Sequence, residues 1–133
     1  MQYLLDTDTC SYAIRGASDV LDERLAGAAS DSLAVSSVTR AELKFGLEKR
    51  GNPRGLSLLV NGFLERVAVL SWDAAAADSF ARLRAQLERR GTPIGLFDTM
   101  IAGHALALKA VLVTNNRKHF GKVRSLKVEN WLE

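Results

Sequence analysis

Short apolar runs alternate with longer amphipathic segments along this chain of 133 residues. Four mainly apolar runs have the length of strands and lie at 2–5, 32–37, 67–70 and 111–114, with a fifth short strand expected near 126–129. The segments between them have the length of helices and lie near 8–15, 19–29, 38–50, 53–66, 73–90 and 96–109.

The spacing of apolar residues assigns a buried face to three of these helices. In the 73–90 segment this face comprises Ala76, Phe80, Leu83 and Leu87. In the 38–50 segment it comprises Val38, Ala41 and Phe45. In the 96–109 segment it comprises Phe97, Met100 or Ile101, His104 and Leu108.

Short apolar strands separated by helices are typical of a parallel sheet that is covered on both faces. We therefore predict a single domain over residues 1–133, an α/β/α sandwich with a mostly parallel sheet of four to five strands. In such sheets ligands bind beside the carboxyl ends of the strands, so the functional residues should lie there.

Composition narrows the class of protein. Hydrophobic residues make up 47% of the chain and charged residues 25%, which is ordinary for a globular protein. No apolar run reaches the roughly 18 residues of a membrane span, and no secretion signal is recognisable. Cys10 is the only cysteine, which excludes an internal disulfide and a zinc site built from cysteines. We expect a cytoplasmic protein with no membrane partner.

The net charge of +3 favours a polyanionic partner only weakly. Basic residues crowd into one stretch near the C-terminus, comprising Arg117, Lys118, Lys122, Arg124 and Lys127. This cluster has two interpretations, a solvated basic face or a surface that contacts phosphates.

Acidic and amide side chains follow the predicted strands at one end. Asp6 ends the first strand, and Glu42 lies in the opening turns of the helix that leaves the second. Asp98 opens the helix that feeds the fourth strand, and Asn115 and Asn116 follow that strand. If the helix runs antiparallel to its strand, all five side chains converge on one edge of the sheet.

Each acid also has a purely structural explanation. Asp6 or Asp8 could cap the first helix, and Thr39 with Glu42 fits a capping box. Asp98 in a first helical turn is favoured by the helix dipole. These explanations do not account for a shared location, whereas a functional site does.

A cluster of carboxylates favours a metal ion. Two carboxylates ~5 Å apart repel by ~3 kcal/mol at an effective dielectric constant of 20, and a cation offsets this repulsion. Oxygen ligands without cysteine favour Mg²⁺ or Mn²⁺. The chemistry that such a site suits best is phosphodiester hydrolysis.

Five stretches of sequence carry a family resemblance: "LLDTDTC" at 4–10, "VSSVTRAEL" at 35–43, "RGTPIGLFDTMIAGHA" at 90–105, "VLVTNNRKHF" at 111–120 and "VENW" at 128–131. Through them the chain resembles the PIN-domain ribonucleases of bacterial toxin–antitoxin modules, the VapC toxins. The resemblance implies a Mg²⁺- or Mn²⁺-dependent endoribonuclease that cuts structured RNA such as tRNA or ribosomal RNA. It also implies a homodimer and a cognate antitoxin, VapB, whose tail enters the active-site groove.

Carried over by position, the resemblance implies that Asp6, Glu42 and Asp98 bind the metal and that Asn116 holds a water molecule or a substrate phosphate. Side chains expected to support them by hydrogen bonds are Thr7, Asp8, Thr114 and Asn115. Side chains expected to contact the RNA backbone are Arg40, Lys44, Arg117, Lys118 and Lys122.

The chain departs from the family at two positions. Asp8 stands where the family usually has asparagine, and it could organise the metal, hold a water or cap the first helix. His119 stands where relatives often carry an acid, which removes a negative charge.

Two other functions remain open. The spacing of Asp6 and Asp8 is similar to that of haloacid-dehalogenase-type phosphatases, but the later motifs of that family do not follow in the right order. A catalytically silent PIN-like binding domain is the second alternative.

Overall fold

The computed structural model describes all residues 1–133. Its strands are β1 (Tyr3–Leu5), β2 (Leu33–Ser36), β3 (Ala68–Leu70), β4 (Val111–Val113) and β5 (Val128–Glu129). Its α-helices are α1 (Thr7–Arg15), α2 (Asp19–Gly27), α3 (Ser37–Lys49), α4 (Arg54–Arg66), α5 (Ala74–Arg89), α6 (Leu96–Leu108) and α7 (Arg117–Phe120). A 3₁₀ turn, Ser30–Ser32, precedes β2. The short helix α7 was not predicted from the sequence.

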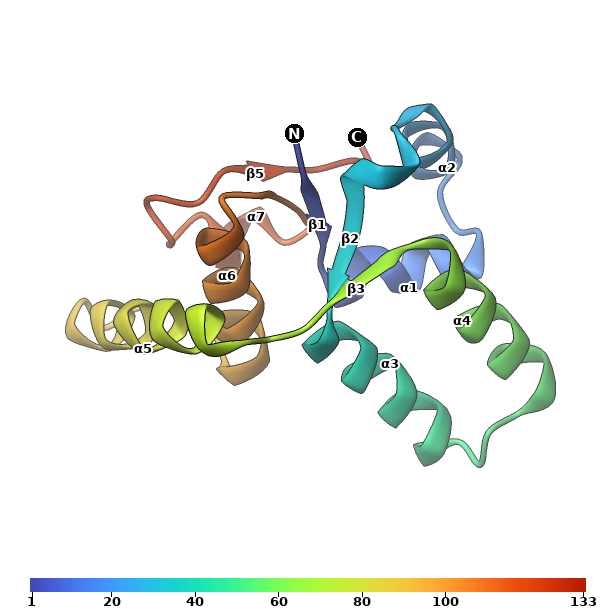
Figure 1. Ribbon diagram of the computed structural model, residues 1–133, viewed down its shortest axis with the longest axis horizontal. Helices are drawn as coiled ribbons and strands as arrows, with labels where there is room; N and C mark the ends of the chain where they lie inside the picture. The colour runs from blue at the N-terminus through green and yellow to red at the C-terminus, as the bar shows by residue number, and fades with distance from the viewer.

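The strands form one five-stranded sheet in the order β3-β2-β1-β4-β5, and every neighbouring pair is parallel. The predicted α/β class, with four to five mostly parallel strands, is confirmed. Because all strands are parallel, their carboxyl ends share one edge of the sheet, and β1 and β2 run downwards towards it in Figure 1. The N- and C-termini lie near each other at the top of Figure 1.

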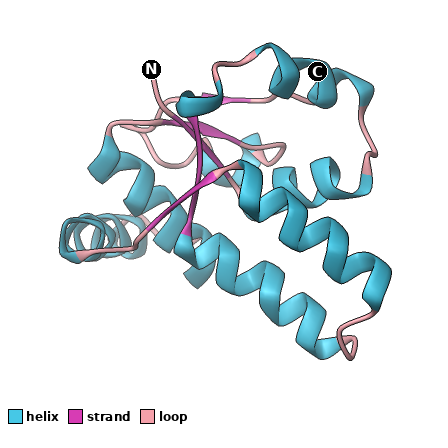
Figure 2. Cartoon of the chain, turned by 45° about the vertical axis from the view of Figure 1, so that its right-hand side comes forward, coloured by secondary structure: helices cyan, strands magenta, loops and turns pink.

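The sheet separates two hydrophobic cores, and successive residues of each central strand point into different ones. Leu4 of β1 packs in a core with side chains from α5 and α6, whereas Leu5 packs in a core with side chains from α1, α3 and α4. Leu112 and Val113 of β4 divide in the same way. Figure 2 shows the strands running between the two groups of helices. The result is a three-layer α/β/α sandwich.

Two predicted helix faces are partly wrong. Phe45 of α3 is 66% exposed and Ala41 is also exposed, while Leu43 and Leu47 are buried beside Val38. Phe97 of α6 is 52% exposed. The packing of α3 turns a different face towards the sheet, whereas in α6 Ile101 and His104 are buried as predicted and only Phe97, in the first turn, is exposed. The face predicted for α5 is confirmed for Ala76, Leu83 and Leu87.

The start of α3 is fixed by Ser36, the last residue of β2. Its hydroxyl accepts a hydrogen bond from the Val38 amide at 3.1 Å and so caps the helix. The same hydroxyl lies 2.9 Å from Nδ1 of buried His104 on α6. Burial lowers the pKa of His104, so the imidazole is neutral at pH 7. This pair ties α3 to α6 beneath the carboxyl edge of the sheet.

Helices α5 and α6 pack closely enough to require glycine at one position. A Cβ on Gly103 would lie 2.8 Å from Cα of Phe80 and 2.9 Å from its amide nitrogen. The close contact between the two backbones fixes the position of α6, whose first turn carries Asp98.

None of the seven α-helices has the length and the apolar composition of a membrane-spanning segment.

Candidate active site at the carboxyl edge of the sheet

Asp6 follows β1 directly and is only 3% exposed. Its Oδ1 accepts a hydrogen bond from the Thr9 amide at 2.8 Å, which caps α1. Its Oδ2 accepts a hydrogen bond from the hydroxyl of Thr114, which follows β4. The structural explanation for Asp6 is therefore correct, and the same carboxylate also lies at the edge where the functional residues were expected.

The environment of Asp6 makes its negative charge costly. Burial raises the pKa of Asp6 from 3.8 to about 6, although hydrogen bonds from Thr114 and Thr9 oppose the rise. The charge of nearby Asp8 adds a smaller upward contribution. A perturbed carboxylate at the carboxyl edge of a parallel sheet is a candidate for function.

Glu42 does not form the capping box that its sequence allowed. Helix α3 begins at Ser37 and is capped by Ser36, so Glu42 lies in the second turn. Its Oε1 lies 2.6 Å from the hydroxyl of Thr7, the first residue of α1. The Thr7 hydroxyl also lies 3.0 Å from that of Thr39. Since a hydroxyl has one proton, Thr7 can donate to Glu42 while it accepts from Thr39.

Glu42 and Asp98 interact through their charges. Burial raises the pKa of Glu42 above its usual range, the Thr7 hydrogen bond opposes the rise, and the charge of Asp98 adds to it. Asp98 lies in the first turn of α6 and is partly exposed. Its Oδ2 lies 3.0 Å from Nδ1 of His119 on α7. Asp98 is thus near Glu42 and is paired with a histidine.

Thr114 connects Asp6 to the segment after β4. It is fully buried, and its hydroxyl accepts a hydrogen bond from the Asn116 amide at 2.9 Å. The Oδ1 of Asn116 accepts a hydrogen bond from the His119 amide at 3.1 Å, which caps α7. Asn115 is exposed, and its Oδ1 accepts a hydrogen bond from Asn130 at 3.0 Å.

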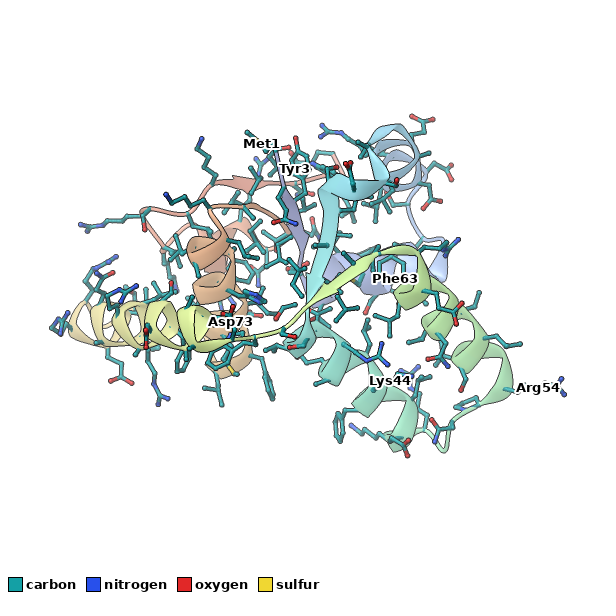
Figure 3. The ribbon with its side chains drawn as sticks, in the orientation of Figure 1. Met1, Tyr3, Lys44, Arg54, Phe63 and Asp73 are labelled. Atoms are coloured by element: carbon teal, nitrogen blue, oxygen red, sulfur yellow. The ribbon has the colours of Figure 1, made fainter.

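Asp8 points into a different neighbourhood from Asp6. It is exposed, and with Glu42 it lines a cleft of about 410 Å³ between α1, α3 and α4. Arg15 and Arg50 also line this cleft, and its apolar lining comprises Ile14, Leu43, Leu47, Leu56 and Val60. Figure 3 shows the two helices α3 and α4, with Lys44 and Arg54 labelled on them. The cleft therefore joins the acidic edge to a partly apolar, partly basic surface.

The basic side chains expected to contact RNA differ in their surroundings. Arg40 and Lys118 are exposed, and Lys122 is half-buried. Arg117 lies 3.8 Å from Glu133 in an exposed ion pair. Lys44 donates a hydrogen bond to Asn61 of α4. The Lys44 ammonium group thus has a hydrogen-bond partner within the protein, whereas that of Lys118 has none.

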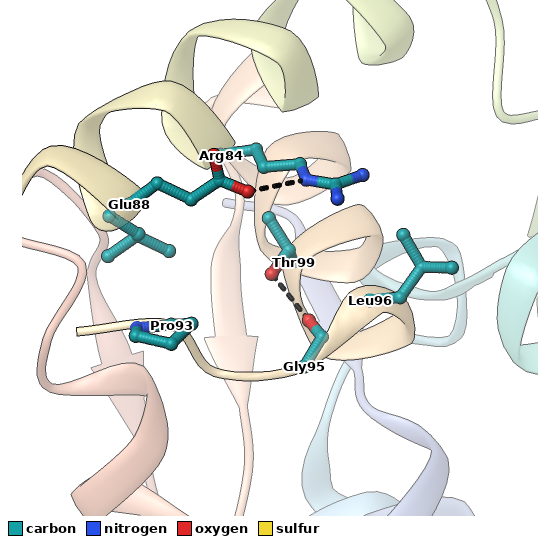
Figure 4. A pocket seen from close by; sticks show the side chains of 7 residues that line it. Arg84, Glu88, Pro93, Gly95, Leu96 and Thr99 are labelled. Carbon is teal, nitrogen blue, oxygen red and sulfur yellow. Dashed lines mark hydrogen bonds and ion pairs between the residues drawn. The ribbon is translucent and has the colours of Figure 1, made fainter. Parts of the chain in front are cut away.

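A smaller cavity of about 190 Å³ lies between the end of α5 and the start of α6 (Figure 4). An exposed Arg84–Glu88 ion pair at 3.2 Å borders it, and Thr99 donates a hydrogen bond to the carbonyl of Gly95 within it. None of the three acids Asp6, Glu42 and Asp98 lines this cavity.

The residues at the edge suit a divalent cation by charge and by donor type. No three Asp, Glu, His or Cys side chains are close enough to form a ready-made ligand cluster. The Asp6 and Glu42 carboxylates nevertheless keep unused lone pairs, and the pKa of each is raised. A cation beside them would remove the cost of their charges, and water molecules could complete its coordination.

Three contacts at this edge were not predicted from the sequence. Thr9 binds Asp6 through its amide, Thr39 contacts Thr7, and His119 pairs with Asp98. The position of Thr9, three residues after an N-cap aspartate, carried a local signal. The other two contacts join residues 32 and 21 positions apart, and no periodic pattern encodes them.

Known proteins match this chain over nearly its whole length. A model of the PIN domain matches residues 3–126. The tRNA(fMet)-specific endonuclease VapC of Shigella flexneri is 39% identical over 131 residues, covering 98% of each chain. Ribonuclease VapC2 of Rickettsia felis is 37% identical over 132 residues, also covering 98% of each chain.

Solved structures give the same result. The crystal structure of DNA-bound VapBC from Salmonella typhimurium matches with a TM-score of 0.93 and 37% identity, covering 98% of each chain. The structure of VapBC2 from Rickettsia felis, bound to a DNA fragment from the promoter, matches with a TM-score of 0.92 and 36% identity. It covers 98% of this chain and 99% of that one.

Proposed function

The chain belongs to the PIN-domain family and, within it, to the VapC ribonucleases; from this premise we propose that it is a divalent-metal-dependent endoribonuclease. We further propose that residues 1–133 form one PIN domain and act as the toxin of a VapBC-type module, inhibiting translation and growth. The observation that supports this most is that Asp6 follows β1 with its pKa raised by burial, while the charge of Asp98 helps to raise the pKa of Glu42.

In this proposal Asp6, Glu42 and Asp98 hold Mg²⁺, with Mn²⁺ able to replace it. The donor set consists of carboxylate oxygens, which these ions prefer. When bound, such an ion neutralises phosphate charge and lowers the pKa of a coordinated water.

Other residues orient these acids and the substrate. Thr7 holds the Glu42 carboxylate, and Thr114 holds that of Asp6. Asn116 uses its Oδ1 to cap α7, and we propose that its side-chain amide group donates to a substrate phosphate or a water. Cleavage in this arrangement leaves 5′-phosphate and 3′-hydroxyl ends.

The substrate is proposed to be a structured RNA, with tRNA as the first candidate because the Shigella flexneri relative is named a tRNA(fMet)-specific endonuclease. Exposed basic side chains near the edge would contact its phosphates, with Arg40 on α3 and Lys118 on α7. Lys122 and Arg117 extend this surface, while Lys44 would first have to leave Asn61.

A VapB-like antitoxin is the proposed protein partner, because the matched structures from Salmonella typhimurium and Rickettsia felis are VapBC complexes. The cleft lined by Asp8, Glu42, Arg15 and Arg50 is the proposed site for its tail. Its apolar lining suits an apolar peptide segment, and its arginines and acids suit charged groups at either end. We also propose that the protein forms a homodimer and acts in the cytoplasm.

The test is cleavage of purified RNA. We expect the purified protein to cut a tRNA pool in the presence of Mg²⁺ and to stop when EDTA is added. Asp98→Asn should abolish cleavage while circular dichroism and the thermal midpoint show a folded protein. Products with cyclic 2′,3′-phosphate ends would contradict the metal-dependent route.

The two alternatives predict different results. A silent binding domain would bind RNA or antitoxin without cutting RNA in any divalent ion. A phosphatase would use Asp6 as a nucleophile, but both oxygens of that buried carboxylate already accept hydrogen bonds. Neither alternative is favoured by a specific observation.

A further inference from the structure

Asp98 and His119 form a hydrogen-bonded pair between two helices. Nδ1 of His119 lies 3.0 Å from Oδ2 of Asp98, and the two residues are 21 positions apart in sequence. Their side chains are 38% and 34% exposed, so the pair is partly shielded from water. Such shielding strengthens a hydrogen bond relative to one on an open surface.

His119 is itself held in place by its own helix. Its amide donates to Oδ1 of Asn116 at 3.1 Å, and the Asn116 amide donates to Thr114 at 2.9 Å. Thr114 in turn donates to Asp6. A continuous series of hydrogen bonds therefore runs from one acid of the edge to another, through the segment after β4.

The geometry assigns a hydrogen-bond donor to His119. A carboxylate only accepts, so a neutral imidazole can bond to Asp98 through Nδ1 only in the tautomer that carries the proton on Nδ1. This bond occupies Oδ2 of Asp98, while Oδ1 has no hydrogen-bond partner within the protein. Oδ1 is the atom that remains available to a cation.

We propose that His119 is a positioning residue for the metal site: it fixes the rotation of the Asp98 carboxylate and leaves Oδ1 free for a divalent cation. An acid at this position would add a negative charge but, when ionised, could not donate to Asp98, whereas His119 donates through Nδ1. The inference rests on the proposed function, because it requires a cation at Asp98.

Three variants separate orientation from bulk and charge. His119→Ala removes the donor. His119→Asn keeps it, because the amide nitrogen of asparagine can occupy the position of Nδ1. Arg84→Ala is the matched control, since it breaks a comparable contact, the 3.2 Å Arg84–Glu88 pair, at a site that includes none of the three acids. Thermal unfolding of each metal-free variant checks that it is folded.

The measurement is Mn²⁺ binding by electron paramagnetic resonance, with Mg²⁺ as competitor, at pH 8 and without RNA. We expect His119→Ala to weaken binding by about 10- to 100-fold, the usual effect of losing a residue that orients a metal ligand. His119→Asn should restore most of the affinity, and Arg84→Ala should leave it unchanged. Unchanged affinity in His119→Ala, or equal losses in the alanine and asparagine variants, would overturn the proposal.

A second measurement uses the nitrogen chemical shifts of His119 in the metal-free protein. We expect the tautomer with the proton on Nδ1, and the other neutral tautomer would overturn the assignment. Metal binding and RNA cleavage, measured separately, distinguish the positioning role of His119 from the ribonuclease activity. Cation binding that depends on His119 without RNA cleavage would contradict only the proposed ribonuclease, whereas cleavage with His119-independent binding would contradict only the positioning role.

Discussion

The hydroxyl of Thr7 lies 2.6 Å from Oε1 of Glu42, although the two residues are 35 positions apart. This contact joins the first residue of α1, directly after Asp6, to the second turn of α3. It favours the charged form of a carboxylate whose pKa burial raises. The contact thus holds Glu42 towards the edge where Asp6 lies.

Thr7→Val should lower the turnover of RNA cleavage by about tenfold, because valine keeps the shape of threonine but cannot orient Glu42. Thr7→Ser keeps the hydroxyl and should remain close to the native rate. Steady-state cleavage of a defined RNA measures both. Equal rates for the valine variant and the native protein would show that this hydrogen bond does not support catalysis.

The stability of the metal-free protein should decrease as the pH rises from about 4 to about 6. The pKa of Asp6 is 3.8 in the unfolded chain and about 6 in the folded one, so the folded state binds more protons in this window. Above pH 6 the Asp6 carboxylate is charged in both states, and its burial then lowers the free energy of unfolding by about 3 kcal/mol. Urea unfolding at pH 4 and pH 7.5 measures the difference.

Asp6→Asn is the matching variant for this pH dependence, because asparagine can still cap α1 through its side-chain oxygen. It should flatten the pH dependence and raise the free energy of unfolding at pH 7.5. It should also abolish RNA cleavage. A variant with the same pH dependence as the native protein would assign the dependence to other groups.

Divalent cations should stabilise the folded protein. Since Mg²⁺ or Mn²⁺ would bind the folded state, a concentration 100 times the dissociation constant should add about 2.7 kcal/mol to the free energy of unfolding. Differential scanning fluorimetry should show a higher midpoint that EDTA reverses. Glu42→Gln and Asp98→Asn should each reduce the shift, and a full shift in both would place the cation elsewhere.

RNA binding should weaken as the salt concentration rises, because phosphate contacts release counterions. Replacing Lys118 and Lys122 with alanine should lower the salt slope by about 1.4 to 1.8 if each contacts one phosphate, the lower value applying to single-stranded and the higher to double-helical regions. Replacing Arg82 and Arg89 of α5 is the control and should leave the slope unchanged. Fluorescence anisotropy from 50 to 300 mM salt, on the order of the physiological range, tests both pairs. A native slope in the double lysine variant would exclude these side chains from the RNA surface.

Gly103→Ala should destabilise the protein by about 1–3 kcal/mol, because the added Cβ would overlap the backbone of Phe80. Gly62→Ala in α4 is the comparison, since a Cβ there meets no atom within 4 Å. It should stabilise the protein by about 0.4–1 kcal/mol through the unfolded state. Denaturant unfolding measures both, and similar effects would contradict the close approach of α5 and α6.

The sequence determined the layer architecture and the place of each acid along the chain. Short apolar strands between helices required a parallel sheet with two covered faces, and strand ends are local features that the residues Leu5 and Val113 mark clearly. Asp6 and Asp98 could therefore be assigned to the carboxyl edge without coordinates. The buried face of α5 was also predictable, because its apolar residues repeat over a long helix.

The rotation of α3 and the contacts among the acids were decided only by tertiary structure. Ser36 caps α3, and packing against α1 and α4 buries Leu43 and Leu47 while Phe45 faces outwards. Periodicity defines a face only within one helix, whereas pairs such as Asp98–His119 depend on how two elements are placed relative to each other. That placement results from the close packing of the whole core, to which residues from every part of the chain contribute.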